Sequence, residues 1–303
     1  MKNYCVFLVA CFLYASCDKN PTTTDPSLII SIKFDSTQQR FDAFGDSSTI
    51  PIGHAAQHPQ FNGLSLHNIE LVPNELTPLM GGDVIFIGQE TSVGGAIAVD
   101  FDQAIIRSNG EVFVEIPINE LTPGTYQYVR TSVTYQNYSV NFNLNNVPAF
   151  PSGTTNLVDQ QGTVASFVGF NTYINTLQVN QMDTSIQGNR VQGFWAFESD
   201  LTSPYSAYNS IYAGQSAGTT VVNPLFNTTP IPAGSCLVTG SFMQPFEIAG
   251  TETEDIRVEL SYSTNKSFEW QDDNGNGKWD INVGGQTETV VDMGLRGLQA
   301  HKL

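Results

Sequence analysis

The sequence predicts an all-β protein, folded as one large β-sandwich or as two packed sandwiches. Apolar and polar residues alternate along most of the chain, and no long stretch shows the 3.6-residue period of an amphipathic helix. The hydrophobic share is 40%, with 19 Phe and 11 Tyr, which is enough for a packed core. Global disorder is therefore excluded.

Alternation locates the strands. Tyr138, Val140 and Phe142 alternate with Ser139 and Asn141, which places one side of this strand on a core and the other in water. The same reasoning predicts strands at residues 28–34, 64–72, 126–135, 138–144, 191–197, 237–242, 256–262 and 287–291. Asn109-Gly110 favours a tight turn, so residues 104–106 and 112–116 should form a hairpin. The best helix candidate, residues 205–212, is short.

One turn adds information about topology. In Leu121-Thr122-Pro123-Gly124-Thr125-Tyr126, proline and glycine suit the two central positions of a type II turn. The segment resembles the tyrosine corner of Greek-key sandwiches, in which a tyrosine hydroxyl bonds to upstream backbone. This resemblance implies an immunoglobulin-like or Greek-key β-sandwich.

Residues 1–17 resemble the signal of a bacterial lipoprotein. A single lysine, an apolar run too short for the roughly 20 residues of a membrane span, and small residues before Cys17 are typical of an export signal. Leu13-Tyr14-Ala15-Ser16-Cys17 resembles a lipobox, although Tyr14 replaces the usual smaller aliphatic residue. The resemblance implies lipidation of Cys17 and anchoring in a Gram-negative cell envelope, more often at the outer than at the inner membrane. The alternative is an ordinary signal peptide that is cut nearby.

Composition shifts divide the chain further. Residues 1–16 form the signal peptide, and residues 17–27 form a lipidated, proline-containing tether. Residues 28–147 form a β-sandwich domain, and the Pro- and Gly-containing stretch 148–156 is the candidate linker. Residues 157–303 are then a second β-rich domain or a continuation of the same sandwich.

The charge of the chain restricts its partners. There are 12 basic and 29 acidic residues. Removing residues 1–16, which contain Lys2 and no acid, leaves 11 against 29, a balance of −18. Nucleic acid is excluded because phosphate binding needs clustered Lys and Arg, and here they are scattered. The membrane is an expected partner through the lipid, whereas a protein or glycan partner is left open. Cys236 is the only cysteine after Cys17, so no disulfide is expected.

The segment from 272 to 280 resembles the first part of an EF-hand-type calcium loop. Oxygen-bearing side chains stand at positions one, three, five and nine, a glycine stands at position six, and the backbone carbonyl of position seven is a usual ligand. These positions, with seven included, are Asp272, Asn274, Asn276, Lys278 and Asp280. Val283 replaces the glutamate of position twelve, so Glu288 or water would have to complete a Ca²⁺ site. The alternative is the plain tip of a hairpin between strands at 267–271 and 278–283.

A second candidate metal site comes from histidines. His54, His58 and His67 lie in one short part of a chain that has only four histidines. Imidazole suits copper or zinc, so the three could converge on one ion. The alternative is that His67, which alternates with Ile69 and Leu71, is a half-buried residue with its own partner.

Three fragments resemble the MbnP-like family, which are copper-associated β-sandwich proteins of the bacterial envelope. They are Asn-Ile-Glu-Leu-Val at 68–72, the turn at 121–126, and Gln-Gly-Phe-Trp-Ala-Phe at 192–197. The tyrosine pair that usually precedes the first fragment is absent. The resemblance implies a role with copper and makes Trp195 and the histidines candidate residues.

A catalytic motif is present without its structural context. Gly214-Gln215-Ser216-Ala217-Gly218 matches the nucleophile elbow of serine hydrolases, and His301 follows it. An elbow needs a buried strand before it and a helix after it, whereas residues 219–224 are typical of strand or coil. We therefore expect a non-catalytic binding or structural module that holds a divalent cation. A copper-handling protein and a serine hydrolase are the alternatives.

Overall fold

The computed structural model describes residues 25–149, 151–232 and 234–303. Strands account for 53% of the chain and helices for 3%, which confirms the predicted all-β sandwich. Within these ranges, a search for helices that could span a membrane found none. The predicted signal peptide and the lipidation site Cys17 lie outside the described residues.

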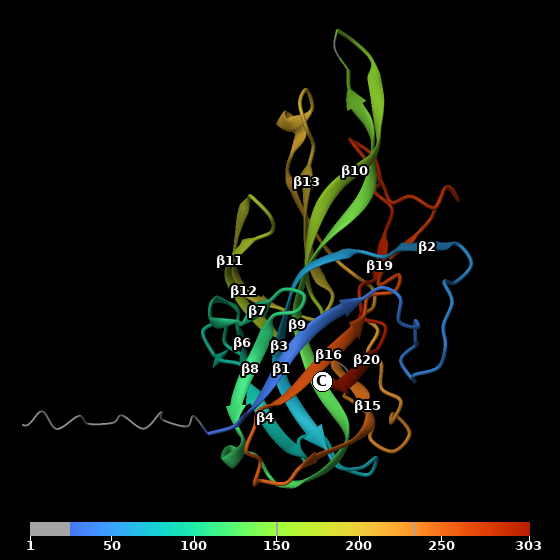
Figure 1. Ribbon diagram of the computed structural model, residues 1–303. Coiled ribbons are helices and arrows are strands. Elements are labelled where there is room, and N and C mark those ends of the chain that lie inside the picture. The colour runs from blue at the N-terminus through green and yellow to red at the C-terminus, as the bar shows by residue number, and fades with distance from the viewer. Residues whose placement is uncertain (1–24, 150, 233) are drawn as a thin grey trace, which may run out of the picture.

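A 13-stranded mixed sheet forms most of the molecule. Its hydrogen-bonded path runs through β14 (Ile211–Gln215), β13 (Phe194–Asp200), β10 (Thr154–Phe167), β9 (Gly124–Pro148), β15 (Leu237–Ile248), β20 (Leu298–Lys302), β16 (Ile256–Ser263), β1 (Ser27–Asp35) and β8 (Val112–Pro117). Four further strands pair beside this path: β3 (Gln60–Val72), β4 (Asp83–Ile87), β7 (Ile106–Arg107) and β18 (Asp280–Asn282). Figure 1 shows β9 and β10 rising together from the body of the protein to the tip of an arm.

Two smaller sheets and three short 3-10 turns complete the fold. The four-stranded sheet contains β12 (Asp183–Arg190), β11 (Thr172–Gln178), β6 (Ala98–Asp100) and β5 (Glu90–Thr91). The three-stranded sheet contains β19 (Val290–Asp292), β17 (Phe268–Gln271) and β2 (His54–Gln57). The turns are η1 (Phe101–Gln103), η2 (Ile118–Glu120) and η3 (Ser206–Tyr208).

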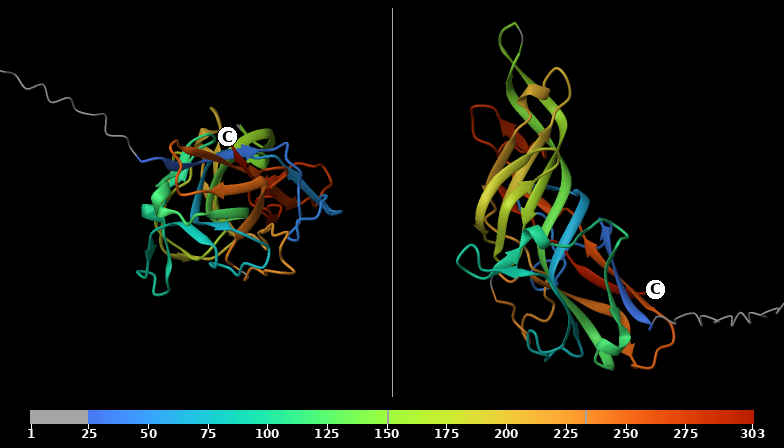
Figure 2. Two further views of the ribbon diagram at one scale, coloured as in Figure 1. Left: turned by 60° about the horizontal axis from the view of Figure 1, so that its bottom comes forward. Right: turned by 90° about the vertical axis from the view of Figure 1, so that its left-hand side faces the viewer.

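Strand β9 organises the packing because it is 25 residues long and pairs with β3, β10, β15 and β18. Its middle part, residues 129–136, is buried throughout. The main core lies on one side of it and includes Phe142, Phe197, Phe268 and Trp279, whose rings meet edge to face. This aromatic cluster joins strands from both halves of the chain. Figure 2 shows the same strands β9 and β10 extending from the body of the protein in two further views.

A second, smaller core lies on the opposite side of the main sheet. Tyr135 of β9 and Phe167 of β10 contribute to it, together with Ile174 and Leu177 of β11. The four-stranded sheet therefore covers part of the outer face of β9 and β10. Beyond this cover the same outer face carries polar residues, as the alternation along β9 predicts.

The predicted tyrosine corner is present. The hydroxyl of Tyr126 donates to the carbonyl of Thr122 at 2.6 Å, and Asp83 Oδ2 lies 3.5 Å from the same hydroxyl. Burial, with the neighbouring charge of Asp83, raises the pKa of Tyr126 to about 12, so the hydroxyl keeps its proton. This contact fixes the entry of the chain into β9.

Three local predictions are corrected. Residues 126–135 and 138–144 are one strand, β9. Residues 104–106 and 112–116 do not pair with each other, because β7 pairs with β3 and β8 pairs with β1. The expected helix at 205–212 is the single turn η3 followed by β14, because pairing with β13 supplies β14 with ladder hydrogen bonds that so short a helix could not match.

The segment 148–156 is a hairpin turn and not a linker. Thr154 pairs with Pro148, and the β9–β10 ladder continues as far as Phe167 opposite Tyr135. Ala149 N also donates to Gly153 O at 3.0 Å across the turn. Proline and glycine suit such a turn as well as a linker, which explains the error. Strands from 28–147 and 157–303 share the main sheet, as in a single continued sandwich.

Candidate functional site

The predicted calcium loop, residues 272–280, connects two different sheets. It leaves β17, which pairs with β2 and β19, and it enters β18, which pairs with β9. Since β17 and β18 do not pair with each other, the alternative of a plain hairpin tip is wrong. Any ligand bound by the loop would therefore link the three-stranded sheet to the main sheet.

The loop winds around its own side-chain oxygens. Asp272 Oδ1 accepts from the backbone N–H of Asn276 at 3.1 Å, and Asp272 Oδ2 accepts from that of Gly277 at 2.9 Å. Asn274 Oδ1 accepts from Asn276 N at 3.0 Å, and Asn276 Oδ1 accepts from Lys278 N at 2.7 Å. Gly275 and Gly277 have φ values of 70° and 71°, which glycine adopts readily. Side chains one, three and five of the loop therefore all point inward.

Asp280 is the centre of the site. Its side chain is buried, and its two oxygens accept from four asparagine amides at 2.6–3.0 Å. Two of these come from the loop, Asn274 and Asn276, and two from β9, Asn143 and Asn145. Burial alone would raise the pKa of Asp280, but these amides together lower it, so the carboxylate is charged at neutral pH.

The two β9 asparagines were missed by the sequence analysis. Alternation places Asn143 and Asn145 on the outer side of β9, but only the parallel pairing of β18 with β9 brings them to Asp280. An open hollow of about 450 Å³ lies over this group, and seven asparagines line it: Asn143, Asn145, Asn146, Asn156, Asn274, Asn276 and Asn282. The site is thus much richer in amides than the loop sequence alone indicates.

Glu288 lies beside the loop, bound to its backbone. Its carboxylate accepts from Asp273 N at 3.0 Å and from Asp280 N at 2.9 Å. Burial raises the pKa of Glu288, the two backbone N–H donors lower it, and the negative charges of Asp280 and Asp272 raise it again. Asp280 and Asp272 are therefore near enough to Glu288 for their charges to act on it. The Lys278 ammonium points outward to Asp159, 2.6 Å away.

The donor set suits a hard cation if amide oxygens take part. In the parts of the chain that the structure describes, no group of three or more His, Cys, Asp or Glu side chains is placed to hold one metal ion. The side chains of Asn274 and Asn276 present nitrogen to Asp280, and their oxygens accept from backbone N–H groups of the loop. For these oxygens to bind an ion at Asp280, each amide would have to turn over and give up that backbone hydrogen bond. The carbonyl of Lys278, position seven of the loop, accepts from Trp270 Nε1 at 3.1 Å and keeps its second lone pair.

The three predicted copper or zinc ligands do not come together. His54 Nδ1 lies 2.7 Å from Glu269 Oε1, His58 Nδ1 accepts from Lys266 N at 3.3 Å, and His67 Nε2 lies 2.9 Å from Glu90 Oε1. His54 and His58 are four residues apart along an extended segment, which is about 13 Å. His67 also stacks on Phe170, with 5.3 Å between ring centroids. Each histidine has its own partner, so the predicted histidine site is not assembled.

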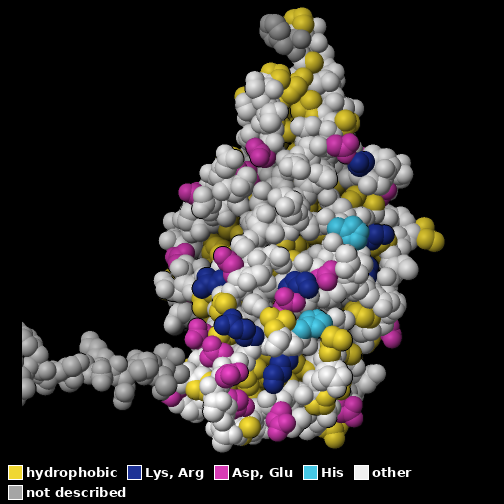
Figure 3. Space-filling model, in the orientation of Figure 1, with side chains coloured by type: hydrophobic (Ala, Val, Ile, Leu, Met, Phe, Trp, Pro, Cys, Tyr) yellow, Lys and Arg dark blue, Asp and Glu magenta, His cyan; other side chains and the backbone are white. Residues whose placement is uncertain are grey.

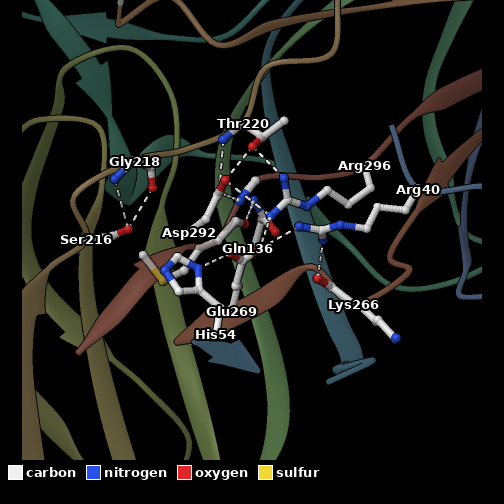
Figure 4. A network of polar contacts seen from close by, with 12 residues as sticks. Arg40, His54, Gln136, Ser216, Gly218, Thr220, Lys266, Glu269, Asp292 and Arg296 are labelled. Carbon is white, nitrogen blue, oxygen red and sulfur yellow. Dashed lines mark hydrogen bonds and ion pairs between the residues drawn. The ribbon is translucent and has the colours of Figure 1, made fainter. Parts of the chain in front are cut away.

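His54 instead belongs to a buried ionic cluster. Figure 4 shows the guanidinium groups of Arg40 and Arg296 directed at Glu269 and Asp292. Arg296 Nη2 lies 3.3 Å from Glu269 Oε2 and 3.2 Å from Asp292 Oδ2. Both arginines and Glu269 are buried, and this burial together with repulsion between the two arginines lowers the pKa of Arg40. With two positive and two negative groups, the cluster is compensated, and it ties the 36–46 loop to β17 and β19.

The candidate nucleophile has no catalytic partner among the described residues. Ser216 is buried and donates to the carbonyl of Gly218 at 2.6 Å, within its own turn (Figure 4). His301 lies on β20, opposite Glu259 of β16. The segment after Ser216 contains no helix. Gly214 and Gln215 of the elbow motif end β14, and residues 216–218 form a small-residue turn after it.

The tryptophans pack in the core. Trp270 and Trp279 are each 1% exposed, and their indole N–H groups donate to the carbonyls of Lys278 and Glu288. Trp195 lies on β13, 6.3 Å from Trp279 between ring centroids.

Figure 3 shows one face of the protein, on which Lys and Arg are dispersed among Asp and Glu. Comparison with protein-family models, curated proteins and solved structures found no match to this chain.

Proposed function

We propose that this protein is a lipid-anchored envelope protein whose β-sandwich is a non-catalytic binding module stapled by Ca²⁺. The observation that carries the calcium part is the 272–280 loop, whose inward side chains converge on the buried carboxylate of Asp280. The residues that would hold the ion are Asp272, Asn274, Asn276, Asp280 and Glu288, together with the carbonyl of Lys278.

Electrostatics supports a cation at this place. Asp272, Asp280 and Glu288 are close enough for the first two charges to raise the pKa of the third. A divalent cation among them would turn this repulsion into attraction. Oxygen ligands of this kind suit Ca²⁺, which tolerates irregular sets of 6–8 ligands, better than Mg²⁺, which requires a strict octahedron.

The position of the loop supports a structural rather than a sensing role. The loop joins β17 to β18, and these strands belong to different sheets. An ion there would hold the three-stranded sheet against the arm. In calcium sensors the ion changes the angle between two helices, whereas this loop lies between two strands. Because no bidentate glutamate stands at position twelve, we expect a Kd on the order of 10⁻⁴ M, as in extracellular modules.

Calorimetric titration of the purified protein with Ca²⁺ tests the staple. One site of this affinity is expected, and Asp272→Ala should abolish it. The matched control is Asp159→Asn, which removes an exposed charge that contacts Lys278 of the same loop, keeps a residue that suits the φ of 51° there, and changes no proposed ligand. Calcium binding that is unchanged by Asp272→Ala, or that is lost equally in both variants, would contradict the assignment.

The anchor is tested separately. Several acyl chains on Cys17, at about 0.8 kcal/mol per buried methylene, would hold the protein at a bilayer. We expect Cys17→Ala to move the protein from the membrane fraction to the soluble fraction while its melting curve stays the same. A Cys17→Ala variant that resists carbonate extraction from membranes would rule out lipid anchoring.

A further inference from the structure

A cleft lies on the outer face of the main sheet, apart from the calcium loop. It has a volume of about 650 Å³, within the usual range for ligand sites. Its floor consists of β9 and β10, where Ser139 pairs with Thr163 and Asn141 pairs with Gln161. One wall is formed by β11 through Thr176 and Gln178, and the end is closed by Phe101 of η1. The small sheet that covers the second core thus also forms a wall of the cleft.

Uncharged hydrogen-bonding groups dominate the lining. Amides come from Asn62, Asn137, Gln161, Gln178 and Asn180, and hydroxyls come from Tyr135, Ser139, Thr163 and Thr176. No lysine, arginine or histidine lines the cleft, and its charges are those of Asp102 and Asp200. An anionic ligand would therefore meet two carboxylates and no counter-charge.

Part of the lining is held in place and part is free to bind. Asn137 Nδ2 donates to the carbonyl of Val179 at 2.8 Å, and Asn137 Oδ1 accepts from Asn62 Nδ2 at 2.8 Å. This amide therefore bridges the two walls across the floor. Gln161 and Gln178 are exposed, and their side chains form no hydrogen bond to any part of the chain that the structure describes. Each can donate and accept at once.

The backbone of the floor is not available for a ligand. The N–H and C=O groups of β9 and β10 are used in their ladders with each other, in the ladder of β9 with β3 and in that of β10 with β13. A peptide that binds by adding a strand needs a free sheet edge, which the floor does not provide. On the floor a ligand must therefore be recognised by side chains, and its own groups should both donate and accept.

We propose that this cleft binds a neutral oligosaccharide. Sugar hydroxyls donate and accept together and match the amide lining, and the apolar face of a sugar ring can pack against the half-buried ring of Phe101. The inference deepens the proposed binding role, but it is independent of the calcium staple, because the cleft and the loop share no residue.

The test is a titration of the purified protein with a panel of neutral hexasaccharides, namely the glucan, xylan and mannan series, followed by calorimetry. Polygalacturonate and a mixed extended-peptide library serve as charged and peptide probes. We expect at least one neutral series to bind, and polygalacturonate and the peptides not to bind.

Variants then locate the site. The double change Gln161→Ala with Gln178→Ala should raise the Kd by about tenfold or more, since each amide loses its hydrogen bonds to the sugar. Both residues are exposed, so the melting temperature should stay the same. Gln127→Ala, an exposed glutamine at the other end of β9, is the control and should bind like the wild type. No binding by any neutral series, binding of the charged or peptide probe instead, or an unchanged Kd in the double variant would overturn the proposal. None of these results would alter the calcium titration, so the two proposals fail separately.

Discussion

Replacing Asp280 with alanine removes the acceptor at the centre of the asparagine-rich site. Four amides donate to its carboxylate, two from the loop and two from β9. This one side chain joins the loop to β9, which is far away in the sequence, and the change removes that link.

The loss of stability depends on which asparagine amides stay away from water after they lose the carboxylate. Hydrogen bonds to a charged group contribute about 1.5–3 kcal/mol each. Asn274 and Asn276 are exposed and can turn to solvent, whereas Asn143 is 7% exposed and Asn145 is half-buried. Two bonds at the lower end of the range give a loss of about 3 kcal/mol. The upper end does not apply, because removing Asp280 also relieves its repulsion of Glu288.

Thermal unfolding in EDTA measures this loss of stability without any contribution from bound metal. For a chain of this size, about 3 kcal/mol corresponds to a fall of about 6 °C in Tm. Asp159→Asn is the control, because asparagine suits the φ of 51° at this position, and the ion pair with Lys278 that it removes is exposed on both sides and should contribute at most about 1 kcal/mol. Equal falls in Tm for the two variants would refute the view that Asp280 organises the site.

Three further predictions concern other parts of the fold. Tyr126→Phe removes the hydroxyl that donates to Thr122 O, and urea unfolding should show a loss of about 1 kcal/mol; an unchanged midpoint would mean that the corner contact does not contribute. Glu269→Gln leaves Arg40 and Arg296 with a neutral partner, so the free energy of unfolding should fall by about 3 kcal/mol or more in the same assay. A variant as stable as the wild type would show that the cluster is not a coupled unit. Glu288 has a raised pKa in the folded state, so its stabilising contribution is complete below its ordinary value of 4.5 and is lost as the pH rises through the folded pKa. In EDTA, Glu288→Gln should therefore gain stability relative to the wild type as the pH is raised from 4 to 7, and a pH-independent difference would contradict this.

The fold could be predicted largely because its signals are local. Alternation along 138–144 depends only on which side of β9 faces the core, and Tyr126 reaches a carbonyl four residues away. The length of β9 could not be predicted, because residues 136 and 137 carry polar side chains that look like a break, while the ladders with β3 and β10 continue through them.

The candidate site could be predicted only in part for the same reason. The spacing from Asp272 to Asp280 is a local pattern, and it does form an inward-facing loop. Asn143 and Asn145 reach Asp280 through a parallel pairing across 137 residues, which no local pattern encodes. The histidines show the opposite error: closeness in the sequence suggested convergence, but extended backbone keeps His54 and His58 about 13 Å apart.

Melting curves of the wild-type protein in EDTA and in calcium test the staple most directly. At a Ca²⁺ concentration a hundredfold above Kd, binding to the folded state alone adds about 2.7 kcal/mol. That corresponds to a rise of about 5 °C in Tm, and Asp272→Ala should abolish the rise. A wild-type Tm that is the same in EDTA and in millimolar Ca²⁺ would contradict the account and leave the 272–280 loop as a connection held by its own hydrogen bonds.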